Sequence, residues 1–249
     1  MRALVRRPSP SLAEGLVTHI ERSEIDIDLA RAQHLAYTKA LEAHGWELHE
    51  VEPADDCPDS VFVEDTLVVF DDLAVLTRPG APQRRGELPG AQAAAELLGL
   101  RVVHIEPPGT LDGGDVLQVG ETVYIGRGGR TNAEGIRQLR ALTGRRTVPV
   151  PLKAVLHLKS AVTALPDGTF LVLPHLVPAE LFGAVRVVDE ESGCHVVPLG
   201  GDAVLIAASA PRTAETLVDL GFDPVIVDIG EFEKLEGCVT CLSVLLWRA

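Results

Sequence analysis

Cys241 is the residue whose side chain could carry out the most distinctive chemistry in this sequence. It closes a C-x-x-C motif and directly precedes the apolar run 242–247. Only a thiolate is nucleophilic, and the pKa of a free cysteine is about 8.5, so most of it is protonated at neutral pH. A catalytic cysteine therefore needs an activating neighbour. His157, in the segment L-H-L-K-S, could supply acid–base chemistry near neutral pH. The two residues therefore predict covalent catalysis through sulfur, although burial as a structural residue is the commoner fate of a cysteine.

Acidic residues beside apolar segments form the second group of candidates. Asp112 lies in T-L-D-G-G-D, where the glycines allow a sharp turn and a close approach to a ligand. Glu64 and Asp65 are adjacent acids between apolar, β-rich runs, and Asp59 precedes them. Such charges are costly to bury unless they are paired or meet a cation. A guanidinium, which is planar and rich in donors, would match several carboxylates; solvated loop charges are the alternative.

The remaining cysteines, Cys57, Cys194 and Cys238, give no clear metal site. Cys238 and Cys241 form the C-x-x-C motif, but no second such motif or nearby H-x-x-x-H completes a zinc site. A thioredoxin-like pair would open a helix after an early strand, whereas this pair precedes a terminal apolar strand. Metal and redox roles are therefore less favoured, and we expect no metal and no cofactor.

A weak internal repeat would bring the candidate residues together. Five times, a polar or Gly-rich segment leads into a β-rich apolar run, with hairpin turns at 71–72, 120–121 and 166–168. The markers of the five units follow one another at 48, 45, 43 and 41 residues, and they are Glu64, Asp112, His157, Gly200 and Cys241. Periods of 20–50 residues are typical of solenoids, propellers and arrays. Closure into a ring would make the polar turns converge, and an ordinary open α/β sheet is the alternative.

Helical patterns alternate with these runs. They cover 28–44, 90–98, 131–142 and 213–220, with Gly45 as a C-cap of the first and Thr131 or Asn132 as an N-cap of the third. Each pattern precedes a further β segment. We therefore predict one α/β domain over residues 1–249, closed by the C-terminal strand lying beside the N-terminal one.

Composition limits the function further. The chain has 249 residues, 46% of them hydrophobic, and no apolar run approaches the roughly 18 residues of a membrane span. The first residues lack the apolar stretch of a signal peptide, so we expect a cytoplasmic protein that does not bind membranes. A net charge of −14 disfavours nucleic acid as a partner and suits a cationic ligand, although it also serves solubility alone.

Six segments together resemble the dimethylarginine dimethylaminohydrolase family. This family belongs to the guanidino-group-modifying superfamily, which includes arginine deiminases and amidinotransferases. The segments occur in family order across nearly the whole chain, and they are P-D-S-V-F-V-E-D-T, T-R-P-G-A-P-Q-R-R, L-D-G-G-D-V-L, G-R-G-G-R-T-N, L-H-L-K-S and E-F-E-K-L-E-G-C-V-T-C-L-S-V-L. The resemblance implies a five-bladed α/β propeller (pentein) built from pseudo-five-fold ββαβ-type repeats, in agreement with the repeat.

The resemblance also implies the role of each site residue. Cys241 would be the nucleophile, His157 the general acid–base, and Asp112 the acid that grips a guanidinium beside them. Substrate-binding roles would fall to seven further residues: Glu64 and Asp65 around the guanidinium, Arg84 and Arg130 on the α-carboxylate, and Asp59 with the carbonyls of Leu16 and Leu235 on the α-amino group. Leu16 would belong to a mobile lid. Glu236 stands where Asp is frequent in relatives, which leaves the loop before Cys241 open.

The expected reaction is hydrolysis of Nω-methylated arginine to citrulline and dimethylamine or methylamine, through an S-alkylthiouronium intermediate on Cys241. The partner would be a small cationic amino acid, and an exposed strand edge could support a homodimer. Another guanidino hydrolase, such as an arginine deiminase, is the alternative; Arg84 and Arg130 argue against agmatine, which has no carboxylate. A non-catalytic guanidinium-binding module on the same fold is a third hypothesis.

Overall fold

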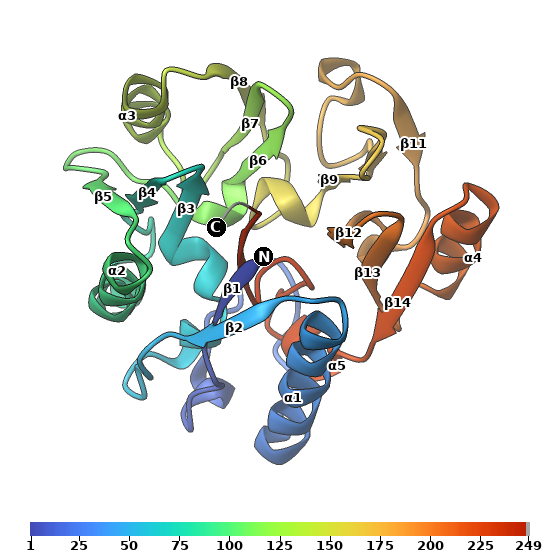
Figure 1. Ribbon diagram of the computed structural model, residues 1–249, viewed down its shortest axis with the longest axis horizontal. Coiled ribbons are helices and arrows are strands. Elements are labelled where there is room, and N and C mark those ends of the chain that lie inside the picture. Colours follow the sequence, from blue (N-terminus) through green and yellow to red (C-terminus); the bar gives the residue numbers. More distant parts are fainter. Residues whose placement is uncertain (248–249) are drawn as a thin grey trace.

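Five three-stranded sheets stand around a central axis in the computed structural model, which describes residues 1–247 (Figure 1). Within each sheet an inner strand pairs antiparallel with a middle strand, and the middle strand pairs parallel with an outer one. From inner to outer, the strands are β15 (Val244–Leu246), β1 (Arg2–Val5) and β2 (Glu47–Glu50); β3 (Leu67–Phe70), β4 (Leu73–Leu76) and β5 (Arg101–His104); β6 (Val116–Val119), β7 (Thr122–Arg127) and β8 (Arg146–Pro151); β9 (Val162–Ala164), β10 (Phe170–Val172) and β11 (Val185–Val187); and β12 (Val196–Gly200), β13 (Ala203–Ala207) and β14 (Asp223–Val227). This is the predicted five-bladed α/β propeller.

A crossover helix joins the middle and outer strands in four of the five blades that the structure describes. These helices are α1 (Ile27–Ala43), α2 (Leu88–Leu97), α3 (Ala133–Thr143) and α4 (Pro211–Asp219), and they lie on the outside of the ring (Figure 1). Parallel neighbours need such a crossover because a hairpin cannot connect them. The blade of β9–β11 has only a 3₁₀ turn, Ala179–Leu181, at this place, and all three residues of β11 are exposed.

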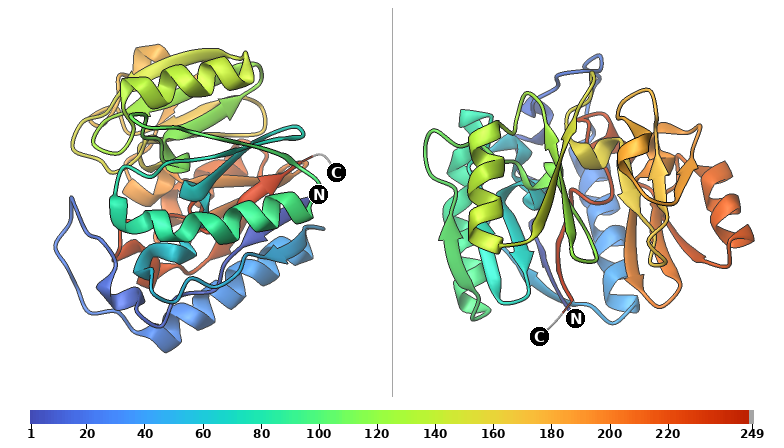
Figure 2. Two further views of the ribbon diagram at one scale, coloured as in Figure 1. Left: turned by 90° about the vertical axis from the view of Figure 1, so that its left-hand side faces the viewer. Right: turned by 90° about the horizontal axis from the view of Figure 1, so that it is seen from above.

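The ring is closed by the two ends of the chain. β15 pairs antiparallel with β1, so that Leu4 lies opposite Val244 and Arg2 opposite Leu246. The terminal strands therefore complete one sheet, and Figure 2 shows the first strand and the last strand side by side. The predicted pairing of the C-terminal and N-terminal strands is confirmed.

The local signals in the sequence were mostly sufficient to place these elements. All four helical patterns are α-helices, and the three predicted hairpin turns join β3 to β4, β6 to β7 and β9 to β10. Asn132 caps α3 by accepting the N–H of Gly135 at 2.8 Å, and Gly45, with φ +81°, follows the last residues of α1. None of the helices in residues 1–247 has the length and apolar character that crossing a bilayer requires.

The polar turns of the repeat lie immediately before the inner strands. They are the one-turn segments η3 (Val63–Thr66), η5 (Gly113–Asp115), η6 (Leu158–Ser160) and η8 (Glu191–Cys194), and the turn 239–242 before β15. The choice of Gly200 as the marker of its unit was wrong. Gly200 and Gly201 have positive φ angles and form the hairpin turn between β12 and β13, at the other end of the blade. Cys194 holds the equivalent place, because the segment E-S-G-C, not G-G-D, precedes the inner strand.

Candidate active site

Three of the five polar turns, those before β3, β9 and β15, contribute to one cavity through Asp65, His157 and Cys241. Eight of the ten residues predicted for the site line it, and they are Leu16, Asp59, Asp65, Arg84, Arg130, His157, Leu235 and Cys241. Phe62, Leu156, Glu236 and Gly237 complete the wall. Glu64 and Asp112 do not line this cavity; each lies beyond its wall.

Asp112 lies behind the imidazole of His157. Its Oδ2 is 3.0 Å from Nε2 of His157, and its other oxygen accepts the N–H of Gly80 at 2.7 Å. The side chain is completely buried, and Nη1 of Arg130 lies 3.7 Å from the same Oδ2. Asp112 is therefore placed to orient His157 and to hold its charge, whereas the sequence predicted direct contact with a guanidinium.

Asp65 supports the same imidazole from its other nitrogen. Its Oδ1 lies 3.7 Å from Nδ1 of His157 and accepts the N–H of Gly114 at 2.8 Å, while its Oδ2 accepts a hydrogen bond from Arg84. Burial would raise the pKa of Asp65, but the charges of His157 and Arg84 lower it to about 2. The carboxylate is thus ionised at neutral pH and borders the cavity as a fixed negative charge.

The protonation of His157 follows from these partners. Burial would lower its pKa, but the charge of Asp65 and the hydrogen bond to Asp112 raise it to about 9. The imidazole is therefore protonated at neutral pH. A protonated imidazole beside a cysteine can give its proton to a departing amine.

Asp115, the last residue of T-L-D-G-G-D, is a further residue of the site beyond the ten that the sequence predicts. Its buried carboxylate accepts the N–H of Leu158 at 2.9 Å and the hydroxyl of Thr131 at 2.5 Å. Burial raises its pKa to about 6, against the opposing charge of His157. Asp115 fixes the turn that presents His157. The sequence does contain a signal for Asp115, because Asp112 and Asp115 both stand in the Gly-rich motif that precedes the inner strand β6.

The two predicted carboxylate-binding arginines are not equivalent. Arg84 is buried and donates from Nε and Nη2 to the two oxygens of Glu87, at 2.8 Å each, and from Nη1 to Asp65. Its Nη2 also contacts the carbonyls of Asp59 and Phe62. A guanidinium has five N–H groups, and the described residues accept hydrogen bonds from four of them. Within residues 1–247, one hydrogen on Nη1 is therefore left for a ligand.

Arg130 has more freedom at the mouth of the same cavity. Its Nη2 lies 3.5 Å from the hydroxyl of Thr18 and its Nη1 lies 3.7 Å from Asp112, which are long contacts for hydrogen bonds. Its side chain is 13% exposed, compared with 5% for Arg84. Arg130 is therefore the arginine better able to turn toward an anionic group.

The segment after residue 15 covers the cavity. The N–H of Leu16 lies 3.1 Å from each carboxylate oxygen of Asp59, whose pKa is raised by burial against the charge of Arg84. The N–H groups of Thr18 and His19 both donate to the carboxylate of Glu236, the latter at 3.0 Å. Glu236, which the sequence left unassigned, thus holds this segment down from the loop before Cys241.

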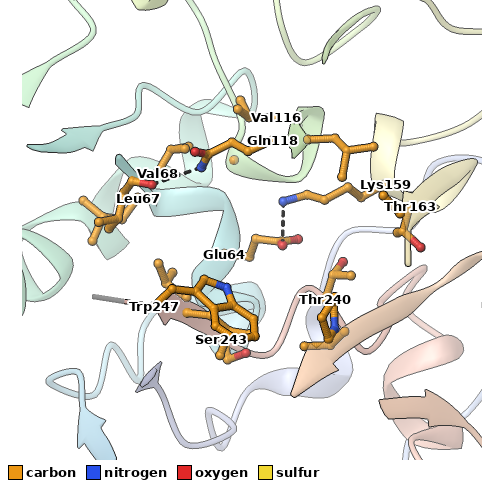
Figure 3. Close-up of a pocket in the computed structure, with 18 of the residues that line it drawn as sticks. Glu64, Leu67, Val68, Val116, Gln118, Lys159, Thr163, Thr240, Ser243 and Trp247 are labelled. Carbon is orange, nitrogen blue, oxygen red and sulfur yellow. Dashed lines mark hydrogen bonds and ion pairs between the residues drawn. The ribbon is translucent and has the colours of Figure 1, made fainter. Parts of the chain in front are cut away.

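Glu64 faces a different space, the channel along the axis of the ring (Figure 3). Its Oε1 accepts a hydrogen bond from Lys159 at 2.6 Å, and its buried Oε2 has no partner among the described residues. Burial raises the pKa of Glu64 to about 7, against the charge of Lys159. The channel is lined from all five inner strands, including Val68, Gln118, Thr163, Val197 and Val244. Adjacent residues of the turn η3 point to different sides, so Asp65 reaches the cavity and Glu64 reaches the channel.

Cys241 presents its sulfur to the cavity from a turn of the chain. Its carbonyl accepts the N–H of Glu64 at 3.2 Å, and its Sγ lies 3.3 Å from that of Cys238. The hydrogen bond with Cys238 and burial raise the pKa of Cys241, whereas the same bond lowers that of Cys238. The pair therefore loses its first proton more readily than its second. A cation bound beside Cys241 would draw the negative charge onto it.

One group of side chains has the arrangement of a metal site. Asp65, Asp112 and His157 each offer a ligand atom, and these atoms lie within 4.8 Å of one another. Asp65 and Asp112 are also the two carboxylates that contact the imidazole of His157. The geometry best fits covalent catalysis by Cys241, because a charged imidazole and the carboxylates of Asp59 and Asp65 border the same cavity and suit a planar cation.

Comparison with known proteins agrees with this chemistry. No protein-family model matches the chain. It is 64% identical to an N(G),N(G)-dimethylarginine dimethylaminohydrolase of Streptomyces coelicolor, over 98% of this chain and 96% of the relative. It is 35% identical to the enzyme of the same name from Pseudomonas aeruginosa, over 97% of each chain.

Solved structures give the same result. A dimethylarginine dimethylaminohydrolase variant, as an adduct with S-methyl-L-thiocitrulline, matches with a TM-score of 0.90 and 33% identity over 98% of both chains. The Pseudomonas aeruginosa enzyme, as a cysteine-to-serine variant complexed with citrulline, matches with a TM-score of 0.89 and 34% identity over the same share. With its six motifs in order on a five-bladed propeller, the chain belongs to the dimethylarginine dimethylaminohydrolase family.

Proposed function

We propose that the chain hydrolyses Nω-methylated arginine to citrulline and dimethylamine or methylamine, with Cys241 as the nucleophile. The observation that carries the proposal is the shared cavity of Cys241, His157 and Asp65, in which sulfur, a protonated imidazole and a carboxylate border one small space. Arg130 lies on the wall of the same cavity. A substrate with a guanidinium at one end and a carboxylate at the other fits this distribution of charge.

In the first step the thiolate of Cys241 attacks the guanidino carbon. The bond from this carbon to the methylated nitrogen breaks, and the amine leaves with the proton of His157. What remains on the sulfur is an S-alkylthiouronium. The pKa of His157, raised to about 9, keeps the imidazole in the acid form that this step needs.

In the second step water attacks the same carbon, and the neutral imidazole of His157 takes its proton. The carbon–sulfur bond then breaks, which releases citrulline and returns Cys241 to its starting state. Asp112 and Asp115 act through His157, because one holds its Nε2 and the other holds its turn. Positioning of this kind supplies much of the acceleration in covalent catalysis.

The ends of the substrate are assigned as follows. Asp65 meets the guanidinium, and Glu64 adds negative charge from the channel side above about pH 7, where it is ionised. Arg130, with the free Nη1 hydrogen of Arg84, binds the α-carboxylate. The α-amino group is received by Asp59, together with the carbonyls of Leu16 and Leu235.

A panel of substrates tests the proposal. Asymmetric dimethylarginine, monomethylarginine and arginine are each incubated with wild type and with Cys241→Ser, and citrulline is measured. We expect release from the two methylated substrates by wild type, and a loss of roughly 10³-fold or more in the variant with its fold retained. Preference for arginine would instead assign an arginine deiminase. Substantial turnover by Cys241→Ser would show that Cys241 is not the nucleophile.

The working environment is also part of the proposal. We place the enzyme in the cytoplasm, acting on a free cationic amino acid, since a net charge of −14 disfavours nucleic acid. We propose a homodimer that forms at an exposed edge strand, for which β11 offers unpaired backbone groups. Light scattering of the purified protein tests the dimer, and a monomer across the concentration range would reject it.

A further inference from the structure

The C-x-x-C motif is a feature that the hydrolytic mechanism does not use. The Sγ atoms of Cys238 and Cys241 lie 3.3 Å apart, and the N–H of Cys238 points to Sγ of Cys241 at 3.4 Å. The N–H of Cys241 donates to the carbonyl of Cys238 at 3.0 Å, which closes the turn between them. The turn therefore holds the two sulfurs against each other.

The two thiols differ in their access to the cavity. Both are buried in the same hydrophobic core, but Cys241, which is 5% exposed, lines the substrate cavity, whereas Cys238, which is 1% exposed, is not among the residues that line it. The Sγ of Cys238 also lies 3.2 Å from the hydroxyl of Thr240. The hydrogen bond from Cys241 and the charge of His195 lower the pKa of Cys238. A small oxidant that enters the cavity would meet Cys241 first, with Cys238 next to it.

We propose that Cys238 is a resolving thiol, which captures the oxidised form of Cys241 as an intramolecular disulfide. The oxidant is a hydroperoxide. When the proton that the pair shares lies on Cys238, the thiolate of Cys241 attacks the peroxide, the O–O bond breaks, and sulfenic acid forms with release of water or an alcohol. The sulfur of Cys238 then attacks the sulfenic sulfur, its proton leaves with the hydroxide as water, and the S–S bond forms. Two thiols are oxidised while one peroxide is reduced.

The geometry makes the second reaction local. A disulfide has an S–S length of about 2.05 Å, so the sulfurs need to approach by little more than about 1 Å, a side-chain adjustment within one turn. Capture competes with further oxidation of Cys241 to sulfinic acid, which thiols do not reverse. The disulfide removes the nucleophile and leaves it recoverable by thiol–disulfide exchange. The active site would thus be switched off, and protected, by peroxide.

The other two cysteines do not offer this reaction. Cys194 is buried with its Sγ directed to the carbonyls of Glu191 and Ser160, and Cys57 lies beside Gly86. Neither lines the substrate cavity. Cys57→Ser is therefore a matched control that removes a thiol without touching the pair.

The experiment treats wild type, Cys238→Ala and Cys57→Ser with hydrogen peroxide, followed by dithiothreitol. In wild type and Cys57→Ser, we expect two thiols to disappear together, a linked 238–241 peptide in mass spectra, and recovery of most of the lost activity. In Cys238→Ala, we expect Cys241 to gain two oxygen atoms and less than about a tenth of the lost activity to return. Each activity is compared with that of the same untreated protein.

The peptide map of wild type decides the outcome even where Cys238→Ala folds poorly, and Cys238→Ser provides a second variant. Oxidation of Cys241 to sulfinic acid in wild type without the linked peptide would overturn the proposal, as would equal recovery in wild type and Cys238→Ala. The effect on activity rests on Cys241 being the nucleophile. Thiol counts and peptide maps do not depend on that role, so failure of the two proposals can be told apart.

Discussion

Nε2 of His157 lies 3.0 Å from the carboxylate of Asp112, which is completely buried behind the cavity wall. The two residues are 45 positions apart and begin equivalent turns of neighbouring blades. The propeller therefore builds the acid–base group of the site from two repeats. Together with the charge of Asp65, this contact raises the pKa of His157 and so shapes how the activity should depend on pH.

Asp112→Asn is expected to move the alkaline limb of the pH–rate profile. In wild type, activity should fall as His157 loses its proton near pH 9. Loss of the negative charge destabilises the imidazolium, so the limb moves to lower pH by roughly one to three units, and kcat falls by about 10²-fold. Rates from pH 5 to 10 measure this, with Asp202→Asn in the β12–β13 turn as control. If the alkaline limb of the pH–rate profile is unchanged in Asp112→Asn, the limb reports the ionisation of a group other than His157.

Arg130→Ala and Arg84→Ala should fail in different ways. Arg130→Ala removes a charged donor at the cavity mouth, worth about 2 kcal/mol, so KM should rise roughly 30-fold with little change in kcat. Arg84→Ala strands the buried carboxylates of Glu87 and Asp65, and we expect a loss of about 3–5 kcal/mol in the free energy of unfolding. Steady-state kinetics and urea unfolding of both variants test the distinction. Equal losses of stability would contradict it.

The sequence predicted the fold and most of the cavity because both depend on one repeating pattern. Each polar turn precedes an inner strand, so a residue chosen from that place in the repeat, such as Cys241 or His157, lies near the axis once the ring closes. The alternation of helices and strands also fixed the elements, since local patterns determine them. The error at Gly200 arose because a hairpin turn and a polar turn both read as Gly-rich segments before an apolar run.

The sequence could not predict which side of a turn each acid faces. Glu64 and Asp65 are adjacent, but one meets Lys159 in the channel and the other meets His157 and Arg84 at the cavity. That choice depends on partners about 20 to 95 positions away. The contribution of Glu236 was hidden for the same reason, since its partners lie 217 and 218 positions away.

Glu236→Asn should loosen the segment that covers the cavity. Asn tolerates the left-handed backbone of this position, where φ is +60°, but its side chain is too short by one methylene to reach Thr18 and His19. Loss of two charge-assisted hydrogen bonds should expose the segment about ten-fold more often, and limited proteolysis should cut it correspondingly faster. Glu215→Asn on the exposed face of α4 is the control. Equal cleavage rates would show that Glu236 does not hold the segment.

Burial of the Glu64 carboxyl, which the charge of Lys159 offsets only in part, should make the stability of the protein fall as pH rises. The pKa of Glu64 is raised from 4.5 to about 7 in the folded chain. Between these values the unfolded chain releases the proton and the folded chain keeps it, so stability is full below pH 4.5 and declines up to about pH 7. The decline that this group contributes is on the order of 3 kcal/mol.

Glu64→Gln isolates that contribution, because glutamine keeps the shape and does not titrate. Lys159 loses its partner in the variant, but it is charged throughout this range, so its cost is constant and only the slope against pH matters. Urea unfolding at pH 5 and pH 8 should give a difference between wild type and variant that changes by roughly 2–3 kcal/mol, toward relative gain for the variant at pH 8. Glu215→Gln should run parallel to wild type. Parallel curves for Glu64→Gln as well would mean that Glu64 ionises in the folded channel as readily as in the unfolded chain, and that the channel is wet enough to solvate it.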